Sequence, residues 1–103
     1  MSEQRSSKLY LVHCGYYDQA VNGGTFEAHA NYFVVAYDFG EAREKAKALP
    51  AFKRLSMHVD GMQEVQAVHG HPIVVGEPDP LLGDETKILV YRKRGHDPKL
   101  AGE

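Results

Sequence analysis

Hydrophobic and polar residues alternate most regularly over residues 26–37, and this period of two predicts a β-strand. One set of alternate positions is aromatic, aliphatic or small: Phe26, Ala28, Ala30, Tyr32, Val34 and Ala36. The other set is polar at first and apolar later: Glu27, His29, Asn31, Phe33, Val35 and Tyr37. Because residues 32–36 are apolar on both sides, we expect this part of the strand to be covered on both faces.

The next segment changes to spacings of three and four, which predict an α-helix over residues 38–49. Asp38 and Glu41 have the spacing of a capping box, with aspartate in place of the usual Ser or Thr. The apolar stripe of the helix consists of Phe39, Ala42, Ala46 and Leu49. Pro50 disfavours helical geometry in the residue before it, so the helix is expected to end there, and a short second turn can begin at Pro50.

Four shorter segments are also expected to be strands. Residues 8–14 and 86–93 are rich in β-forming side chains. Residues 57–67 form another candidate, in which Gly61 marks a bulge. Residues 72–75 follow a glycine-containing turn and are expected to be the hairpin partner of that strand.

The resulting order, β-β-α-β-β-β, predicts an α+β fold. We expect a small mixed, mostly antiparallel sheet of four to five strands with one helix on one face. Because the helix is a crossover between the second and third strands, those two should run parallel with a right-handed connection. The first strand can then lie between them, with the other pairings antiparallel.

Length and composition indicate one globular domain. The chain has 103 residues, of which 43% are hydrophobic and 25% charged. We expect the domain to span residues 8–93, with a flexible tail at residues 1–7 and a loose tail at residues 94–103. The net charge of -2 argues against a nucleic-acid-binding surface, which is usually basic.

Neither a signal peptide nor a membrane span is visible, since no apolar run is long enough. Cys14 is the only cysteine, so no intrachain disulfide can form and a cytoplasmic location is expected. The neighbouring His13 points to the opposite face of a strand, so Cys14 is interpreted as a small buried apolar residue rather than a nucleophile.

The dimensions of the predicted elements indicate self-association. A helix of this length is about 16 Å long and about 10 Å wide. A sheet of four or five strands is about 20 to 24 Å wide, so one helix cannot cover both of its faces. A homodimer is expected to hide the second apolar face of residues 32–36. The alternatives are a cover made by the loop that carries Tyr16 and Tyr17, or by the C-terminal strand.

Two pairs of ligand-type residues form the main candidate site. Glu27 and His29 share one side of their strand, and so do His58 and Asp60. If the strands are neighbours, the two imidazoles and two carboxylates suit a divalent ion such as Zn, Fe or Mn, or general acid–base chemistry. If the first strand separates them by about 10 Å, the first pair is expected to face water and the second to hydrogen-bond across strands.

Other candidates for ligand contact are weaker. Tyr16 and Tyr17 lie in a long loop, where function is often found. His69 and His71 flank a glycine and are expected to be solvated turn residues. The sequence contains no phosphate-binding loop, dinucleotide fingerprint or nucleophile elbow, so no cofactor other than a metal is indicated, and a small-molecule ligand stays unknown.

Short motifs in residues 8–12, 26–35, 57–61 and 68–73 resemble a bacterial family called Domain of Unknown Function 1543. The shared features are a Glu-x-His before a Phe-Val-Val run and a His-x-Asp after the helix. The resemblance draws attention to the same four ligand-type residues but implies no activity, because none is established for that family. The chain departs from the family pattern at residues 50–52, where Pro-Ala-Phe replaces a Trp-Phe-Gly segment.

The sequence does not identify a reaction. The first hypothesis is a small dimeric binding or interaction protein without catalytic activity. The alternative is a small metal- or histidine-dependent enzyme that uses Glu27, His29, His58 and Asp60. A third hypothesis is a subunit of a larger complex whose exposed sheet edge accepts a strand from a partner.

Overall fold

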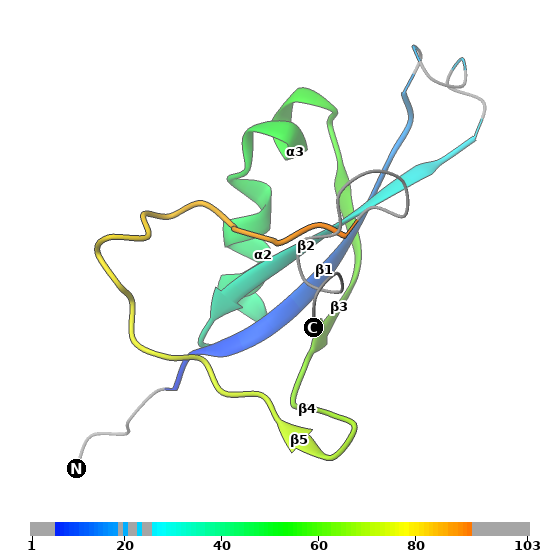
Figure 1. Ribbon diagram of the computed structural model, residues 1–103. Helices are drawn as coiled ribbons and strands as arrows, with labels where there is room; N and C mark the ends of the chain where they lie inside the picture. The colour runs from blue at the N-terminus through cyan, green and yellow to red at the C-terminus, as the bar shows by residue number, and fades with distance from the viewer. Residues whose placement is uncertain (1–5, 19, 21–22, 24–25, 92–103) are drawn as a thin grey trace.

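A three-stranded antiparallel sheet forms the centre of the protein (Figure 1). The computed structural model describes residues 6–18, 20, 23 and 26–91. The strands are β1 (Lys8–Tyr16), β2 (Ala28–Ala36) and β3 (His58–Glu64), in the spatial order β2-β1-β3. The helices α2 (Phe39–Lys47) and α3 (Pro50–Arg54) connect β2 to β3, and β4 (Ala67–Val68) pairs with β5 (His71–Pro72) in a separate hairpin.

The predicted α+β class, with a small sheet and helical cover on one face, is confirmed. β1 lies between β2 and β3 and is antiparallel to both, so the two outer strands run parallel to each other, as the crossover predicts. The short turn expected to begin at Pro50 is α3.

The core lies between the sheet and α2 and is built from side chains on one face of each strand. Tyr10, Val12 and Cys14 are almost fully buried on β1. They share this core with Val34, Ala36, Ala42, Ala46, Phe52 and Met57. Because the two buried residues of α2, Ala42 and Ala46, are both small, its axis can approach β1 and β2 closely.

The N-terminus of α2 has the predicted cap. The backbone N–H of Glu41 donates to Asp38 Oδ1 at 2.8 Å, and the N–H of Tyr37 donates to Glu41 Oε1 at 2.7 Å. Phe39, which was expected on the buried stripe, is partly exposed and meets Tyr10 edge-on, with ring centroids 5.0 Å apart. As the first residue of the helix, it lies at the margin of the core.

The prediction that β1 ends before Gly15 is wrong. β1 continues to Tyr16, because Gly15 pairs with His29 on one side and with His58 on the other. A central strand is stabilised by two ladders, which outweighs the low strand preference of glycine. The expected bulge in β3 is present, with Asp60 as the extra residue, since His13 pairs with Gly61 and Cys14 with Val59.

Two strand predictions in the C-terminal third differ from the structure. The predicted strand 57–67 is divided into β3 and β4, so the predicted hairpin with residues 72–75 is present only as the short pair β4–β5, in which Ala67 pairs with Pro72. The turn between them contains His69 and Gly70 with positive φ. Residues 86–91 belong to no strand, because no strand of the described chain lies alongside them, and residues 92–93 lie outside the described part. The predicted tails also fall largely outside it, at residues 1–5 and 94–103.

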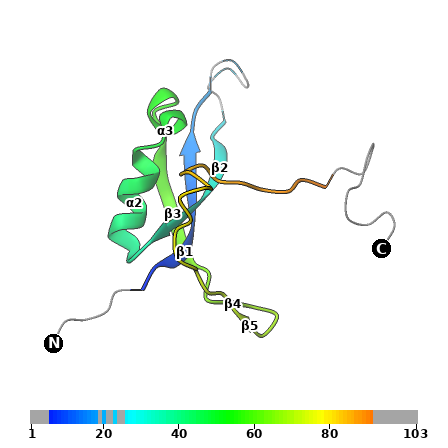
Figure 2. The same ribbon diagram turned by 60° about the vertical axis from the view of Figure 1, so that its left-hand side comes forward.

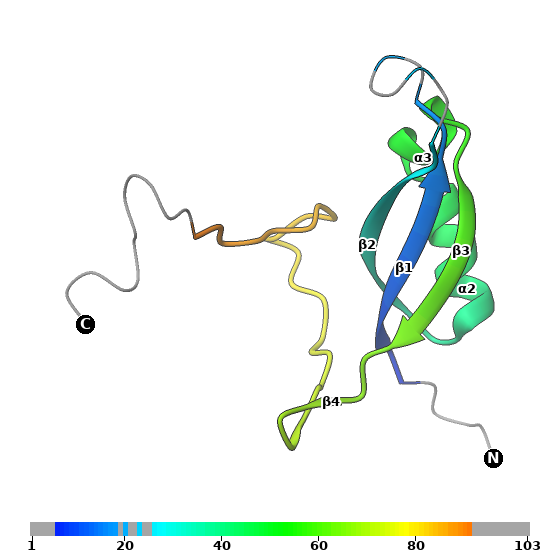
Figure 3. The ribbon, with the colours of Figure 1, turned by 90° about the vertical axis from the view of Figure 1, so that its right-hand side faces the viewer.

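The helices cover only one face of the sheet (Figure 2). On the other face, Leu9 and Leu11 of β1 stand opposite Val35 and Phe33 of β2. We call these four residues the open face, because within the described chain no helix or strand packs over them (Figure 3). No helix among the described residues has the length and apolar character needed to cross a bilayer.

Candidate metal centre

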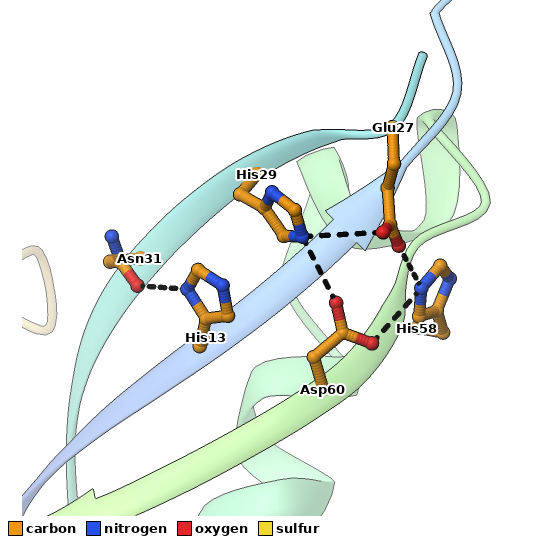
Figure 4. A network of polar contacts seen from close by, with 6 residues as sticks. All are labelled: His13, Glu27, His29, Asn31, His58 and Asp60. Carbon is orange, nitrogen blue, oxygen red and sulfur yellow. Dashed lines mark hydrogen bonds and ion pairs between the residues drawn. The ribbon is translucent and has the colours of Figure 1, made fainter. Parts of the chain in front are cut away.

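Glu27, His29, His58 and Asp60 meet at one end of the sheet, where β2 begins, β3 begins and β1 ends (Figure 4). Glu27 immediately precedes β2, His29 lies on it, and His58 and Asp60 lie on β3. All four side chains project from the face of the sheet that the helices leave uncovered. We refer to them as the His–carboxylate cluster.

The four side chains alternate in a closed ring of short contacts. His58 Nε2 lies 2.6 Å from Glu27 Oε2 and 3.1 Å from Asp60 Oδ1. His29 Nε2 lies 3.4 Å from Glu27 Oε1 and 3.2 Å from Asp60 Oδ2. Each carboxylate therefore bridges both imidazoles, and each imidazole presents its Nε2 to both carboxylates.

Gly15 explains how the ring closes across β1. Its backbone lies under the centre of the ring, and a Cβ atom built there would lie 2.6 Å from Asp60 Oδ2 and 2.7 Å from His58 Nε2. It would also collide with Glu27 Oε2. The separation of about 10 Å expected from an intervening strand applies to the backbones, and the missing side chain lets the functional groups meet above it.

The cluster is accessible to a small ligand. Its side chains are between 29% and 48% exposed, the imidazoles more than the carboxylates, so all four keep contact with solvent. Two carboxylates facing the same point concentrate negative charge where a cation would sit. The arrangement therefore favours a positively charged ligand.

His13 and Asn31 extend the polar region along the same face. The His13 ring stacks on the His29 ring, with centroids 4.5 Å apart and planes 11° from parallel. His13 Nδ1 lies 2.7 Å from Asn31 Oδ1, which fixes the His13 ring beside the cluster. Ligand atoms of His13, His29 and Asp60 lie within 4.8 Å of one another. His13 was not among the sequence candidates, although its place two residues before Gly15 puts it on the same face.

A shallow hollow adjoins the cluster on this face. Its volume is about 370 Å³, and it is lined by Leu11, His13, Asn31, Gly61, Met62 and Gln63. His13 lies between the hollow and the cluster. On its other side the hollow borders Leu11, so it lies between the cluster and the open face.

The weaker candidates make none of the contacts of the ring. Tyr16 packs against the core, on the side of β1 opposite to Gly15, and Tyr17 is exposed after the end of the strand. His69 and His71 are exposed in the β4–β5 hairpin. Cys14 is buried, and burial together with the charge of Asp60 raises the pKa of its thiol, which disfavours the thiolate that a nucleophile needs.

The donor set has the composition of a metal centre. Two imidazole nitrogens and two carboxylates are ligands that Zn, Fe and Mn accept. Each carboxylate can offer one or both oxygens, and the exposed side of the cluster can admit a further ligand.

Known proteins give no indication of the function of this chain. No protein-family model, curated protein or solved structure matches the chain. The resemblance to the Domain of Unknown Function 1543 family therefore stays a prediction. Function has to be inferred from the His–carboxylate cluster itself.

Proposed function

We propose that the protein binds a divalent transition-metal ion, Zn, Fe or Mn, at Glu27, His29, His58 and Asp60. The observation that carries this proposal is the closed ring of four nitrogen–oxygen contacts, from 2.6 to 3.4 Å, above Gly15.

Hydrogen bonding alone accounts poorly for that ring. An imidazole Nε2 carries at most one hydrogen, so two histidines can direct at most two hydrogens at the four carboxylate contacts. The two carboxylates also repel each other unless positive charge lies between them. A cation beside the carboxylates would offset this repulsion. Ligand atoms of Glu27, His58 and Asp60 lie within 4.8 Å of one another, and so do those of His13, His29 and Asp60.

The spacing of the ligand atoms supports the same conclusion. Bonds of about 2.0 to 2.1 Å in tetrahedral geometry place neighbouring ligand atoms about 3.3 Å apart. Three of the four separations, 3.1, 3.2 and 3.4 Å, are close to that value. The fourth, 2.6 Å between His58 and Glu27, is a hydrogen bond that a metal would replace.

Metal binding is compatible with either of the leading hypotheses. In a binding protein, the ion would hold the starts of β2 and β3 together across β1. In an enzyme, it would supply a Lewis acid, and the exposed side of the cluster would admit a small substrate. Partial exposure of all four side chains favours a centre with an accessible position over a fully enclosed structural site.

The experiment is elemental analysis of untagged protein from cells supplied with Zn, Fe and Mn. We expect about one ion per chain, and its loss in the double variant His29→Ala/His58→Ala. The matched control is His69→Ala/His71→Ala, which removes the same number of histidines from the β4–β5 hairpin and should leave the metal content unchanged.

Circular dichroism would establish that both variants fold. Metal-free wild-type protein that also fails to bind added Zn, Fe or Mn in a titration would refute the proposal. So would equal metal content in the two double variants.

A further inference from the structure

The chain carries an apolar surface and an apolar segment that do not cover each other. The surface is the open face, in which Phe33 of β2 is 49% exposed although it pairs with Leu11 of the central strand β1. The segment is residues 73–91, which we call the arm.

The arm contains short apolar runs whose side chains are exposed to solvent. None of its residues belongs to a helix or strand, and apart from a turn at residues 80–82 it is irregular. Seven large apolar side chains in it are between 53% and 92% exposed: Val74, Leu81, Leu82, Ile88, Leu89, Val90 and Tyr91. Soluble proteins rarely leave so many apolar side chains of one segment in water.

The direction of the arm connects the two features. It lies on the side of the sheet that the helices do not cover. There it first runs alongside the strands at a distance from them, and its last described residues then turn outward (Figures 2 and 3). Its run Ile88-Leu89-Val90-Tyr91 is strongly β-forming, yet it pairs with no strand in the described chain.

We propose that the protein is a homodimer in which the arm of each copy lies on the open face of the other. A twofold axis makes the exchange reciprocal, so each chain supplies one arm and one open face, and both are covered. A second copy is the occupant that the structure favours, because each chain carries both an exposed open face and an exposed apolar arm, and two copies can therefore cover both surfaces of each other. This inference stands independently of metal binding.

The exchange has a consequence for the His–carboxylate cluster. Strand pairing places Leu11, His13 and Gly15 on one face of β1, so the open face and the cluster occupy one continuous surface. An arm seated on the open face of its partner would border the hollow that Leu11 and His13 line. The second copy would then close one side of the region beside the cluster.

The first test is the mass of the full chain in solution, measured by size-exclusion chromatography with light scattering. We expect twice the chain mass of 11.5 kDa. Phe33→Asp on the open face and the double variant Leu89→Asp/Val90→Asp in the arm should each raise the dissociation constant of the dimer at least about thirtyfold. The matched control, Tyr17→Asp, alters an aromatic side chain of similar exposure, 56%, outside both surfaces and should stay dimeric.

The second test distinguishes an exchanged arm from other dimers. A Phe33→Asp chain keeps an intact arm, and a Leu89→Asp/Val90→Asp chain keeps an intact open face. Mixed in equal amounts, they should form a heterodimer even though each alone is monomeric, because one complete arm-to-face contact is restored.

Three results would overturn the proposal. They are a monomeric wild-type chain, a dimer that resists both sets of substitutions, and a failure of the two variants to associate on mixing. Far-ultraviolet circular dichroism identifies any variant that has not folded. For such a variant, Phe33→Ser and Leu89→Ser/Val90→Ser serve in the same mixing test.

Discussion

Replacing Gly15 by alanine should separate metal binding from folding. The added methyl group would lie 2.6 Å from Asp60 Oδ2 and 2.7 Å from His58 Nε2, well inside van der Waals contact. Because these atoms are the ends of partly exposed side chains, they can swing into solvent instead of compressing the core. The methyl group would then occupy the position at which the ligands have to converge.

The effect on stability should be small. Gly15 is not among the glycines with positive φ, so alanine can adopt its backbone conformation. Alanine in a strand recovers about 0.5 to 1 kcal/mol relative to glycine through the smaller entropy of its unfolded chain. Rearrangement of the ligand side chains opposes that gain, and we expect a net change within about 1 kcal/mol in the metal-free protein.

The effect on metal affinity should be large. Displacing even an outer partner of a metal ligand costs about 10- to 100-fold in affinity, and Gly15→Ala would displace three of the proposed ligands themselves. We therefore expect a loss of at least about 100-fold, equivalent to about 2.7 kcal/mol. Competition against a chromophoric chelator measures this loss, and urea denaturation of the metal-free protein measures stability.

Gly61→Ala is the matched control for this substitution. Gly61 lies on the neighbouring strand, has no positive φ, and a Cβ atom there would meet nothing within 4 Å. The Gly61→Ala variant should bind metal with the same affinity as the wild type. Unchanged affinity in Gly15→Ala, or an equal loss in Gly61→Ala, would refute the claim that Gly15 provides the space for the cluster.

Three further predictions concern the fold. Asp38→Ala removes the acceptor for the N–H of Glu41 and should cost about 1 kcal/mol in urea denaturation, and no loss would contradict the capping role. Phe52→Ala empties a core position on α3 and should cost about 3 to 5 kcal/mol, and a loss below about 1 kcal/mol would contradict its place in the core. Burial raises the pKa values of Cys14 and Tyr10 above their ordinary 9.0 and 10.0, so the unfolded chain loses these protons first. The melting temperature should therefore be insensitive to these groups below pH 9 and fall as the pH rises above it, with a smaller fall in Cys14→Ala.

The elements predicted correctly are those whose signals are local. The alternation around Val34 identifies β2, and Asp38 with Glu41 marks the start of α2, because both patterns depend on neighbours within a few residues. The parallel relation of β2 and β3 follows from the crossover between them. The position of β1 between these strands is an arrangement that the order of elements allows but does not require.

The failed strand prediction has a physical reason. Residues 86–91 carry a β-forming sequence, but a strand exists only where another strand satisfies its backbone groups, and the described chain provides none beside them. Sequence preference cannot show whether such a partner belongs to the same chain or to a second one.

The cluster could be predicted only in part. The spacing of Glu27 with His29, and of His58 with Asp60, shows that each pair shares a face. That the pairs meet depends on Gly15 standing between them in register, which no spacing along the chain reveals. The contribution of His13 likewise depends on its stacking against a residue of another strand.

Anomalous diffraction at the absorption edge of Zn, from crystals of the protein loaded with that metal, tests the metal centre most directly. The account predicts a peak about 2.0 to 2.2 Å from Nε2 of both His29 and His58 and bounded by the carboxylates of Glu27 and Asp60. A peak at His69 and His71 instead, or no peak above Gly15, would contradict it.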